Sequence, residues 1–353
     1  MTVKTVFVQR ADEKNPRSSE GDFVRLPNGR ILFAYSRFHG GSHDHSPSDI
    51  AGLFSDDNGK SFTPPQTLIT AGEHHTENIM SVSLVTLKNG DAGIFYLVKQ
   101  PDGTNDYVMR RTKDGITFSE AKSCIPKTSS QSYYVINNGR ILRASTGRLI
   151  IPAALHRNSD YNLTRFDGRA LVVFFYSDDD GDTWHEAPGM IFPPHAARTQ
   201  TGLQEPGIIE LPSGALYAYA RTDLYCQYES ISVDNLNSWS PAQPSPFSSP
   251  ASPLSIRQNP FTGEYFAVWN PIPNYFGREI APRTAGRTPL AMARSQNGHD
   301  FSALFVLESD STKGFCYPSL FFPDANTLLL SYCFGGEEDD GFLNCLKIVR
   351  ISI

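Results

Sequence analysis

The sequence predicts an all-β protein, a six-bladed β-propeller formed by residues 1–353 as one domain. Three observations lead to this prediction. The 27 glycines and 25 prolines are spread along the chain, which is typical of many tight turns between short strands. A strand, turn and strand pattern returns six times, and a second turn motif is interleaved with it.

The first repeat is a hairpin whose turn is followed by an apolar strand. Turn residues of this kind adopt the backbone angles that tight hairpins need. The turns recur at intervals of 49 to 67 residues. They lie at Asn28-Gly29, Asn89-Gly90, Thr146-Gly147, Ser213-Gly214, Thr262-Gly263 and Ala325-Asn326, before the strands ILFAYSR, AGIFYLVK, LIIPAALHR, ALYAYAR, YFAVWN and LLLSYCF.

The second repeat is a polar turn that follows those strands. Its Ser or Thr and its Asp or Asn can bind turn amides, its Gly supplies a positive φ, and its aromatic residue packs beneath. The motif resembles the Asp-box. Full copies are SDDNGKSF at Ser55 and SDDDGDTW at Ser177, and reduced copies are TKDGITF at Thr112, SVDNLNSW at Ser232 and SQNGHDF at Ser295.

The two repeats in register define a unit of about four strands, which is one propeller blade. Six blades close a ring without a long open sheet edge. The last repeat lacks the polar turn, so we expect the C-terminal CLKIVRISI to share a sheet with the N-terminal VKTVFV and to close the ring. Two packed β-sandwiches would not explain a repeat that continues through the whole chain.

Composition excludes several classes of partner. The net charge is −6, and Lys and Arg form no run, so neither a nucleic acid nor an anionic membrane is expected as a partner. No window approaches 18 apolar residues and no export signal is evident, which predicts a soluble, intracellular protein. The five cysteines are odd in number and form no CxxC pair, which predicts buried thiols instead of disulfides or a zinc site. The sequence leaves the oligomeric state open.

Polar residues recur where the predicted inner strands begin and end, and a propeller brings such positions together around its axis. A solvated channel with paired charges is the alternative explanation. The strand starts are Glu20, Asn78, Asn138, Glu205, Ser252 and Tyr317, and the strand ends are Arg37, Lys99, His156, Arg157, Arg221, Asn270 and Cys333.

The hairpin QEPGIIELPSGALYAYAR, residues 204–221, carries an acid at its start and a cation at its end. Because the ends of a hairpin meet at one edge, Glu205 and Arg221 should lie side by side. A buried carboxylate beside a buried guanidinium is costly unless each has a partner or a purpose. A purely structural ion pair is the alternative.

Several segments resemble the sialidase family of six-bladed propellers, over essentially the whole chain. The 204–221 hairpin resembles the family's glutamate-to-arginine hairpin, GRTPLAMARSQNGHDF resembles a segment that delivers another arginine of the family's triad, and CYPSLFFPDANTLLLSY resembles the segment with the catalytic tyrosine. The resemblance implies that Tyr317 is the nucleophile, that Glu205 is its partner, and that Arg221 and Arg287 bind the substrate carboxylate.

The loop SHDHSPSDIAGLFSDDNG occupies the place of the family's acid/base aspartate, which implies Asp44 first and Asp49 second. The chain departs from the family at the first arginine, where it has NPRSSEGDFV, so either Arg17 or Arg37 is the candidate. The histidines have no counterpart in the family pattern. They are His43, His45, His74 and His75.

The resemblance implies a retaining exo-glycosidase that acts on a glycan or glycoconjugate ending in sialic acid or a related ulosonic acid. Such a substrate bears a carboxylate that would repel an anionic nucleophile, so a neutral tyrosine attacks while a neighbouring base takes its proton. The reaction needs no metal or other cofactor. A glycosidase or lyase on a uronic-acid glycan, with His45 or His74 moving the proton, and a non-catalytic carbohydrate-binding propeller stay open as alternatives.

Overall fold

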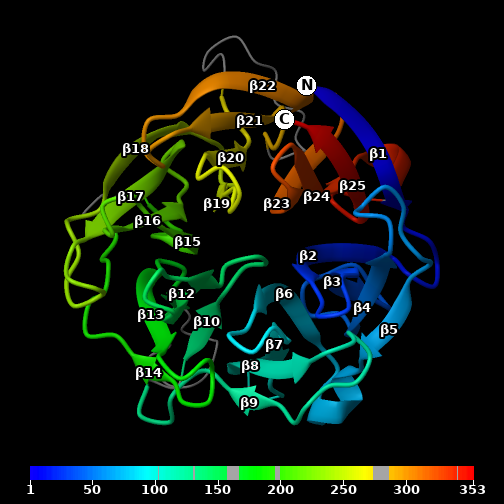
Figure 1. The fold of residues 1–353 in the computed structure, drawn as a ribbon, viewed down its shortest axis with the longest axis horizontal. Helices are drawn as coiled ribbons and strands as arrows, with labels where there is room; N and C mark the ends of the chain where they lie inside the picture. Colours follow the sequence, from blue (N-terminus) through cyan, green and yellow to red (C-terminus); the bar gives the residue numbers. More distant parts are fainter. Residues whose placement is uncertain (102, 130–131, 157–166, 195–198, 273–285, 340) are drawn as a thin grey trace.

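Six antiparallel sheets surround a common centre, as Figure 1 shows, in a computed structural model of the chain. The residues described are 1–101, 103–129, 132–156, 167–194, 199–272, 286–339 and 341–353. Sequence order follows the ring, so each sheet is one blade and the predicted six-bladed propeller is confirmed.

The first three blades come from the N-terminal half, and each runs outward from an inner strand. Their strands are β2 (Arg17–Arg25), β3 (Ile31–Phe38), β4 (Ser48–Ser55) and β5 (Gln66–Ile69); β6 (Ile79–Thr86), β7 (Ala92–Lys99), β8 (Asn105–Thr112) and β9 (Lys122–Ser123); and β10 (Tyr133–Val135), β11 (Leu142–Arg143), β12 (Leu149–His156), β13 (Leu171–Ser177) and β14 (His185–Glu186).

The other three blades have four strands each, and the last one includes the N-terminal strand. Their strands are β15 (Gln204–Glu210), β16 (Leu216–Arg221), β17 (Cys226–Ser232) and β18 (Gln243–Ser248); β19 (Ser255–Gln258), β20 (Tyr265–Trp269), β21 (Leu290–Ser295) and β22 (Ser302–Glu308); and β23 (Gly314–Asp324), β24 (Thr327–Gly335), β25 (Cys345–Ser352) and β1 (Thr2–Gln9).

The two ends of the chain close the ring, as predicted. β1 pairs antiparallel with β25, with Thr2 opposite Ser352 and Gln9 opposite Leu346. The labels N and C lie close together in the last blade in Figure 1. The last blade therefore contains both the first and the last strand of the chain, and β1 covers the outer edge of β25.

The polar turns between outer strands form the expected hydrogen bonds. In the first of them the Ser55 hydroxyl donates to Asp57 at 2.8 Å, and the Gly59 amide donates to Ser55 Oγ at 2.9 Å. Gly59 has φ +81°, and a Cβ there would lie 2.5 Å from Leu329 Cδ1 in the neighbouring last blade. The motif thus fixes a turn and also lets it pack closely on the adjacent blade.

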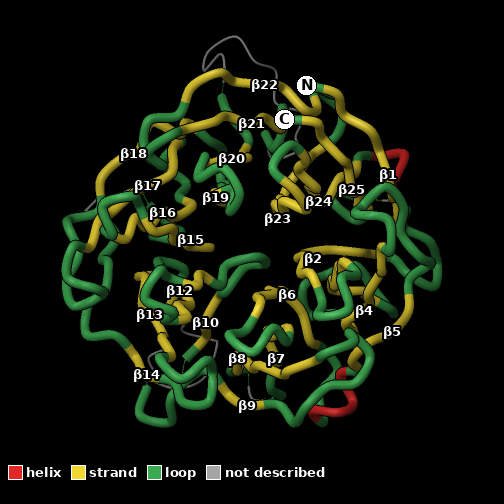
Figure 2. Tube along the Cα trace, viewed as in Figure 1, coloured by secondary structure: helices red, strands yellow, loops and turns green. Residues whose placement is uncertain are grey.

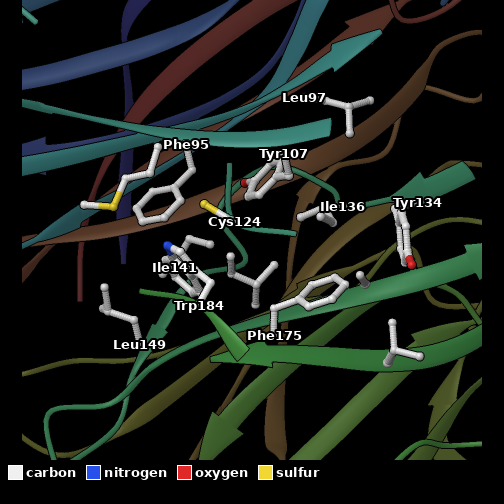
Figure 3. Packing of buried hydrophobic residues seen from close by; sticks show 14 of the residues in the cluster. Phe95, Leu97, Tyr107, Cys124, Tyr134, Ile136, Ile141, Leu149, Phe175 and Trp184 are labelled. Carbon is white, nitrogen blue, oxygen red and sulfur yellow. The ribbon is translucent and has the colours of Figure 1, made fainter. Parts of the chain in front are cut away.

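The hydrophobic core lies between blades. The described residues form six clusters of buried apolar side chains, and each lies mainly between two neighbouring sheets. Successive side chains of a strand point to opposite faces, so Ile208 packs toward the third blade and Ile209 toward the fifth. Figure 3 shows the cluster between the second and third blades, where Phe95 and Phe175 are buried near Trp184.

Little of the chain is helical. Figure 2 shows strands and connecting loops almost throughout. The described residues include the short 3₁₀ turns η1 (Ala71–His74) and η4 (Glu337–Asp339). No helix among the described residues has the length and apolarity that crossing a bilayer requires. The five cysteines are free thiols; four are buried and Cys226 is half-buried.

Candidate active site

The innermost strands of four blades carry the same irregularity. In each, one extra residue is inserted opposite the second strand, which is a β-bulge. The residue at the bulge has a left-handed backbone, with φ of +54° at Glu20, +60° at Ser81, +45° at Glu205 and +55° at Tyr317. This conformation costs a non-glycine residue about 1–2 kcal/mol, and such strain tends to be retained where it aims a side chain at a functional site.

All four bulge residues line one cavity of about 370 Å³. Its wall also includes residues of the second and third blades, the end of β16, and the segment that precedes β21. It is lined by Glu20, Asp44, Met80, Ser81, Leu97, Lys99, Tyr133, Val135, Ile136, His156, Gln204, Glu205, Arg221, Arg287 and Tyr317. The ring thus gathers a phenol, three carboxyl groups and several cations in one place.

Tyr317 is held in its neutral form. Burial raises the pKa of its hydroxyl, and the negative charge of Glu205 raises it further, while Arg287 acts in the opposite direction. The Arg287 guanidinium lies 5.7 Å from the centre of the Tyr317 ring. The negative charge of Glu205 thus acts on the Tyr317 phenol.

Glu205 and Arg221 meet at the open end of the β15–β16 hairpin. Glu205 Oε2 lies 2.8 Å from Arg221 Nη1, and both side chains are largely buried. Burial has the largest single effect and lowers the pKa of Arg221, but the charge and hydrogen bond of Glu205 and the charge of Tyr317 together raise it, so the net shift is upward. Arg221 is therefore charged in the cavity.

Arg287 is buried at the head of β21. It donates to Cys316 Sγ at 3.3 Å and to the Ala251 carbonyl at 3.1 Å. Its charge acts on Arg221 and Tyr317. Both guanidinium groups thus interact electrostatically with the phenol.

Arg17 lies at the start of β2, where it is 8% exposed. Its guanidinium contacts Asp44 Oδ1 at 2.5 Å and packs 4.6 Å from the Phe38 ring centre. Its charge acts on Glu20 and Tyr317. Arg17 thus belongs to the charge cluster of the cavity.

Arg37 and Asp49 are not brought to the cavity. They line a separate groove on the outer part of the first blade, and Arg37 donates to Thr67 there. Asp49 accepts from the Ala71 amide at 2.8 Å and lies 3.2 Å from His39.

The four histidines without a counterpart in the family pattern lie outside the cavity wall. His45 is exposed next to Asp44, and the charge of Lys99 lowers its pKa. His74 shares a hydrogen bond of 2.7 Å with the Tyr96 hydroxyl, and His75 follows the η1 turn. His43 is exposed in the same loop as His45. None of these four lines the cavity, whereas His156 does.

Three of the predicted strand-start residues do not line the cavity. Ser81 occupies the bulge position in the second blade, whereas Asn78 donates to the backbone carbonyls of Asp44 and Ser46. Asn138 donates to the Gly21 carbonyl, and Ser252 is buried outside the cavity wall. A bulge shifts the register by one residue, which a sequence pattern does not reveal. Arg157 lies outside the described residues.

Glu20 is one of the predicted strand starts, and the resemblance to the sialidase family implies no catalytic or binding role for it. It is 6% exposed and lines the cavity. Burial, the largest cause, raises its pKa to about 7, with Asp44 and Glu205 adding to the rise and Arg17 and Lys99 opposing it. The signal that could have identified it is its equivalence to Glu205 and Tyr317 in the repeat.

The family profile described as "BNR repeat-like domain" matches residues 93–328. The chain belongs to this family. Among curated proteins it is similar to the anhydrosialidase of the leech Macrobdella decora, with 32% identity over 151 residues, which cover 40% of this chain and 17% of that protein. The matched part is thus a small fraction of the relative's length.

Solved structures show the same fold as this BNR repeat-like propeller. A Dyadobacter fermentans protein of unknown function has a TM-score of 0.74 at 17% identity, with 99% of both chains covered. A Hadza microbial sialidase also has a TM-score of 0.74, at 15% identity, covering 97% of this chain and 67% of that one. A leech intramolecular trans-sialidase has a TM-score of 0.71 at 14% identity, covering 100% of this chain and 70% of that one. The protein is therefore a divergent, sialidase-like propeller.

Proposed function

We propose that this propeller is a retaining exo-glycosidase of the sialidase type, which removes a terminal acidic sugar such as sialic acid or a related ulosonic acid from a glycan or glycoconjugate. One observation carries the proposal: the Tyr317 phenol shares a cavity with Glu205 and with the guanidinium groups of Arg221 and Arg287. The resemblance to anhydrosialidase supports it.

The charge balance of the cavity favours an anionic sugar. Four cations, Arg17, Lys99, Arg221 and Arg287, act on its three carboxyl groups. Guanidinium groups can bind a carboxylate through two parallel hydrogen bonds, a geometry that lysine lacks. Arg17, and not Arg37, is our candidate for the third member of the clamp, because its charge acts on Tyr317 and Glu20 whereas Arg37 lines another groove.

Tyr317 supplies the nucleophile in this mechanism. Its oxygen bonds to the anomeric carbon as the glycosidic C–O bond breaks, and its proton passes to Glu205. A neutral phenol approaches the carboxylate-bearing carbon without the repulsion that an anion would meet. The leaving oxygen takes up a proton from a carboxyl group, for which the sequence-based candidate is Asp44.

A fluorogenic sialoside tests the proposal directly. The wild-type protein should release the aryl group, and Tyr317→Phe should lose turnover while it still binds a 2,3-unsaturated ulosonic acid, because the phenyl ring and the arginines stay in place. No turnover by the wild type on any ulosonic-acid glycoside, or full activity in the variant, would refute it. Binding without turnover would favour a carbohydrate-binding propeller, and an unsaturated product would favour a lyase.

A further inference from the structure

The three carboxyl groups of the cavity differ in their partners. Asp44 contacts Arg17 at 2.5 Å, and Glu205 contacts Arg221 at 2.8 Å. Among the described residues no ion pair joins Glu20 to a cation, and its buried Oε2 has no hydrogen-bond partner. Glu205 Oε2 also lacks a hydrogen-bond partner, but it has the ion pair with Arg221. A buried polar atom without a partner is costly, so a ligand group is needed to satisfy it.

The bulge of β2 aims Glu20 at the cavity. Glu20 holds the same left-handed position as Glu205 and Tyr317 in their blades. The neighbouring Gly21 allows this arrangement, because a Cβ there would lie 2.3 Å from the Phe33 ring. Glu20 is therefore built into the wall in the same way as the proposed nucleophile and its partner.

The charges around Glu20 come from every side of the cavity. Titratable groups that act on it, or on which it acts, are Arg17 in β2, Asp44 in the β3–β4 loop, Lys99 in β7, Tyr133 in β10, Glu205 in β15, Tyr317 in β23 and Cys333 in β24. Burial raises the pKa of Glu20 to about 7, with the two acids adding to that shift and the two cations opposing it. Near neutral pH this carboxyl can both hold and release a proton.

Asp44 is less suited to donate a proton. Burial opposes its ionisation, but the charge and hydrogen bond of Arg17 outweigh burial and lower its pKa. Its side chain is also 66% exposed, so water stabilises the charged form. A general acid works best when its pKa lies near the working pH, and Asp44 is ionised there.

We propose that Glu20, and not Asp44, is the general acid and base of this site. The proposal rests on the glycosidase function above. In the first step the Glu20 carboxyl proton moves to the leaving oxygen, which keeps the electron pair of the broken C–O bond, while Tyr317 bonds to the anomeric carbon. In the second step Glu20 takes a proton from water, and the water oxygen bonds to the anomeric carbon. The bond between that carbon and the Tyr317 oxygen breaks, and Tyr317 keeps the electron pair and takes its proton back from Glu205.

The test compares two leaving groups in Glu20→Gln and Asp44→Asn. An aryl leaving group departs without protonation, whereas an alkyl sugar aglycone needs it. Glu20→Gln should therefore lower the rate of the first chemical step on an alkyl glycoside by about 10²–10⁴-fold, with a much smaller loss on the aryl glycoside. It should also remove the fall in kcat/KM that the wild type shows above about pH 7 on the alkyl substrate. A structural defect alone would not separate the two substrates.

The controls keep the result interpretable. Circular dichroism and thermal unfolding check that each variant folds, and if Glu20→Gln does not fold, the pH profiles of the wild type on the two substrates serve instead. If kcat/KM falls at alkaline pH on the alkyl glycoside but not on the aryl glycoside, the proton donor is a carboxyl group with the raised pKa of Glu20. Identical profiles overturn the proposal.

Two other results overturn it in distinguishable ways. If Asp44→Asn shows the leaving-group selectivity and Glu20→Gln does not, the proton donor is Asp44 and the glycosidase function stands. If the wild type turns over neither substrate, the glycosidase function fails, and the role of Glu20 fails with it.

Discussion

Glu205 and Arg221 form a largely buried ion pair of 2.8 Å across the two ends of a single hairpin. The β15–β16 register sets Gln204 opposite Arg221, and the bulge that follows turns Glu205 into the cavity. One local structure thus supplies both the group that we propose as a base for Tyr317 and the cation that we propose for a substrate carboxylate.

Removal of one partner of this pair should destabilise the protein strongly. Arg221→Met leaves Glu205 buried without its cation, which costs about 3–5 kcal/mol. Urea unfolding should show that loss, and the double variant Glu205→Gln/Arg221→Met should lose less than the two single losses combined. Arg30→Met is a control because Asp56, the ion-pair partner of Arg30, is 66% exposed, and loss of this pair should cost about 1 kcal/mol or less. Additive losses in the double variant would contradict the coupling.

Two glycines with similar backbones should respond differently to a methyl group. Gly59 and Gly29 have φ of +81° and +86°, but a Cβ at Gly59 would meet Leu329 while one at Gly29 meets nothing within 4 Å. Gly29→Ala should cost about 1–2 kcal/mol from the left-handed backbone. Gly59→Ala should add about 1–3 kcal/mol from overpacking. Thermal unfolding of the two variants measures the difference in stability. Equal losses of stability would show that the contact of Gly59 with the neighbouring blade is unimportant.

The stability of the wild type should depend on the protonation of Glu20. The folded carboxyl keeps its proton up to about pH 7, whereas its ordinary pKa is 4.5, so the folded state binds more protons between these values. Stability therefore falls as pH rises through this window. At 1.36 kcal/mol per pKa unit, Glu20→Gln should gain up to about 3 kcal/mol relative to the wild type between pH 4 and pH 8.

Urea unfolding at a series of pH values measures this difference. Glu13→Gln, at an exposed acid, is the matched control and should follow the wild type across the range. A constant difference between Glu20→Gln and the wild type would mean that Glu20 is ionised in the fold over the whole range.

Arg17 and Arg37 should contribute unequally to binding of an acidic sugar. Arg17→Met should weaken binding of a 2,3-unsaturated ulosonic acid by about 10- to 100-fold, because a hydrogen bond to a charged group is worth about 1.5–3 kcal/mol. Arg37→Met should bind like the wild type, since Arg37 lines a different groove. Calorimetric titration gives the dissociation constants of both variants. If Arg37→Met binds more weakly than Arg17→Met, Arg37 is the third arginine that binds the substrate carboxylate.

The sequence was sufficient for the architecture. Turn residues such as Asn28-Gly29 and Asn89-Gly90, and the polar turns at Ser55 and Ser177, act through local backbone angles and hydrogen bonds. Local rules of this kind can be recognised in a linear pattern and counted along the chain, which is why the six blades and the closing β1–β25 pair could be predicted.

The site could be predicted only in part. The hairpin ends Glu205 and Arg221 were predicted to meet because a single turn joins them. The choice between Arg17 and Arg37 and the exclusion of Asp49 required the structure, because they depend on where β3 and its loop lie relative to the axis.

The sequence by itself determined the repeat, the closure of the ring and the types of residue that each blade offers to its centre. Only the tertiary structure decided which of them share the cavity, and which carboxyl group there forms no ion pair among the described residues. Glu20 shows the physical reason. Its pKa depends on its burial and on charges that lie on separate blades and in the loop between two strands, namely those of Arg17, Asp44, Lys99 and Glu205. Electrostatic energies depend on distances through space, and ring closure sets those distances.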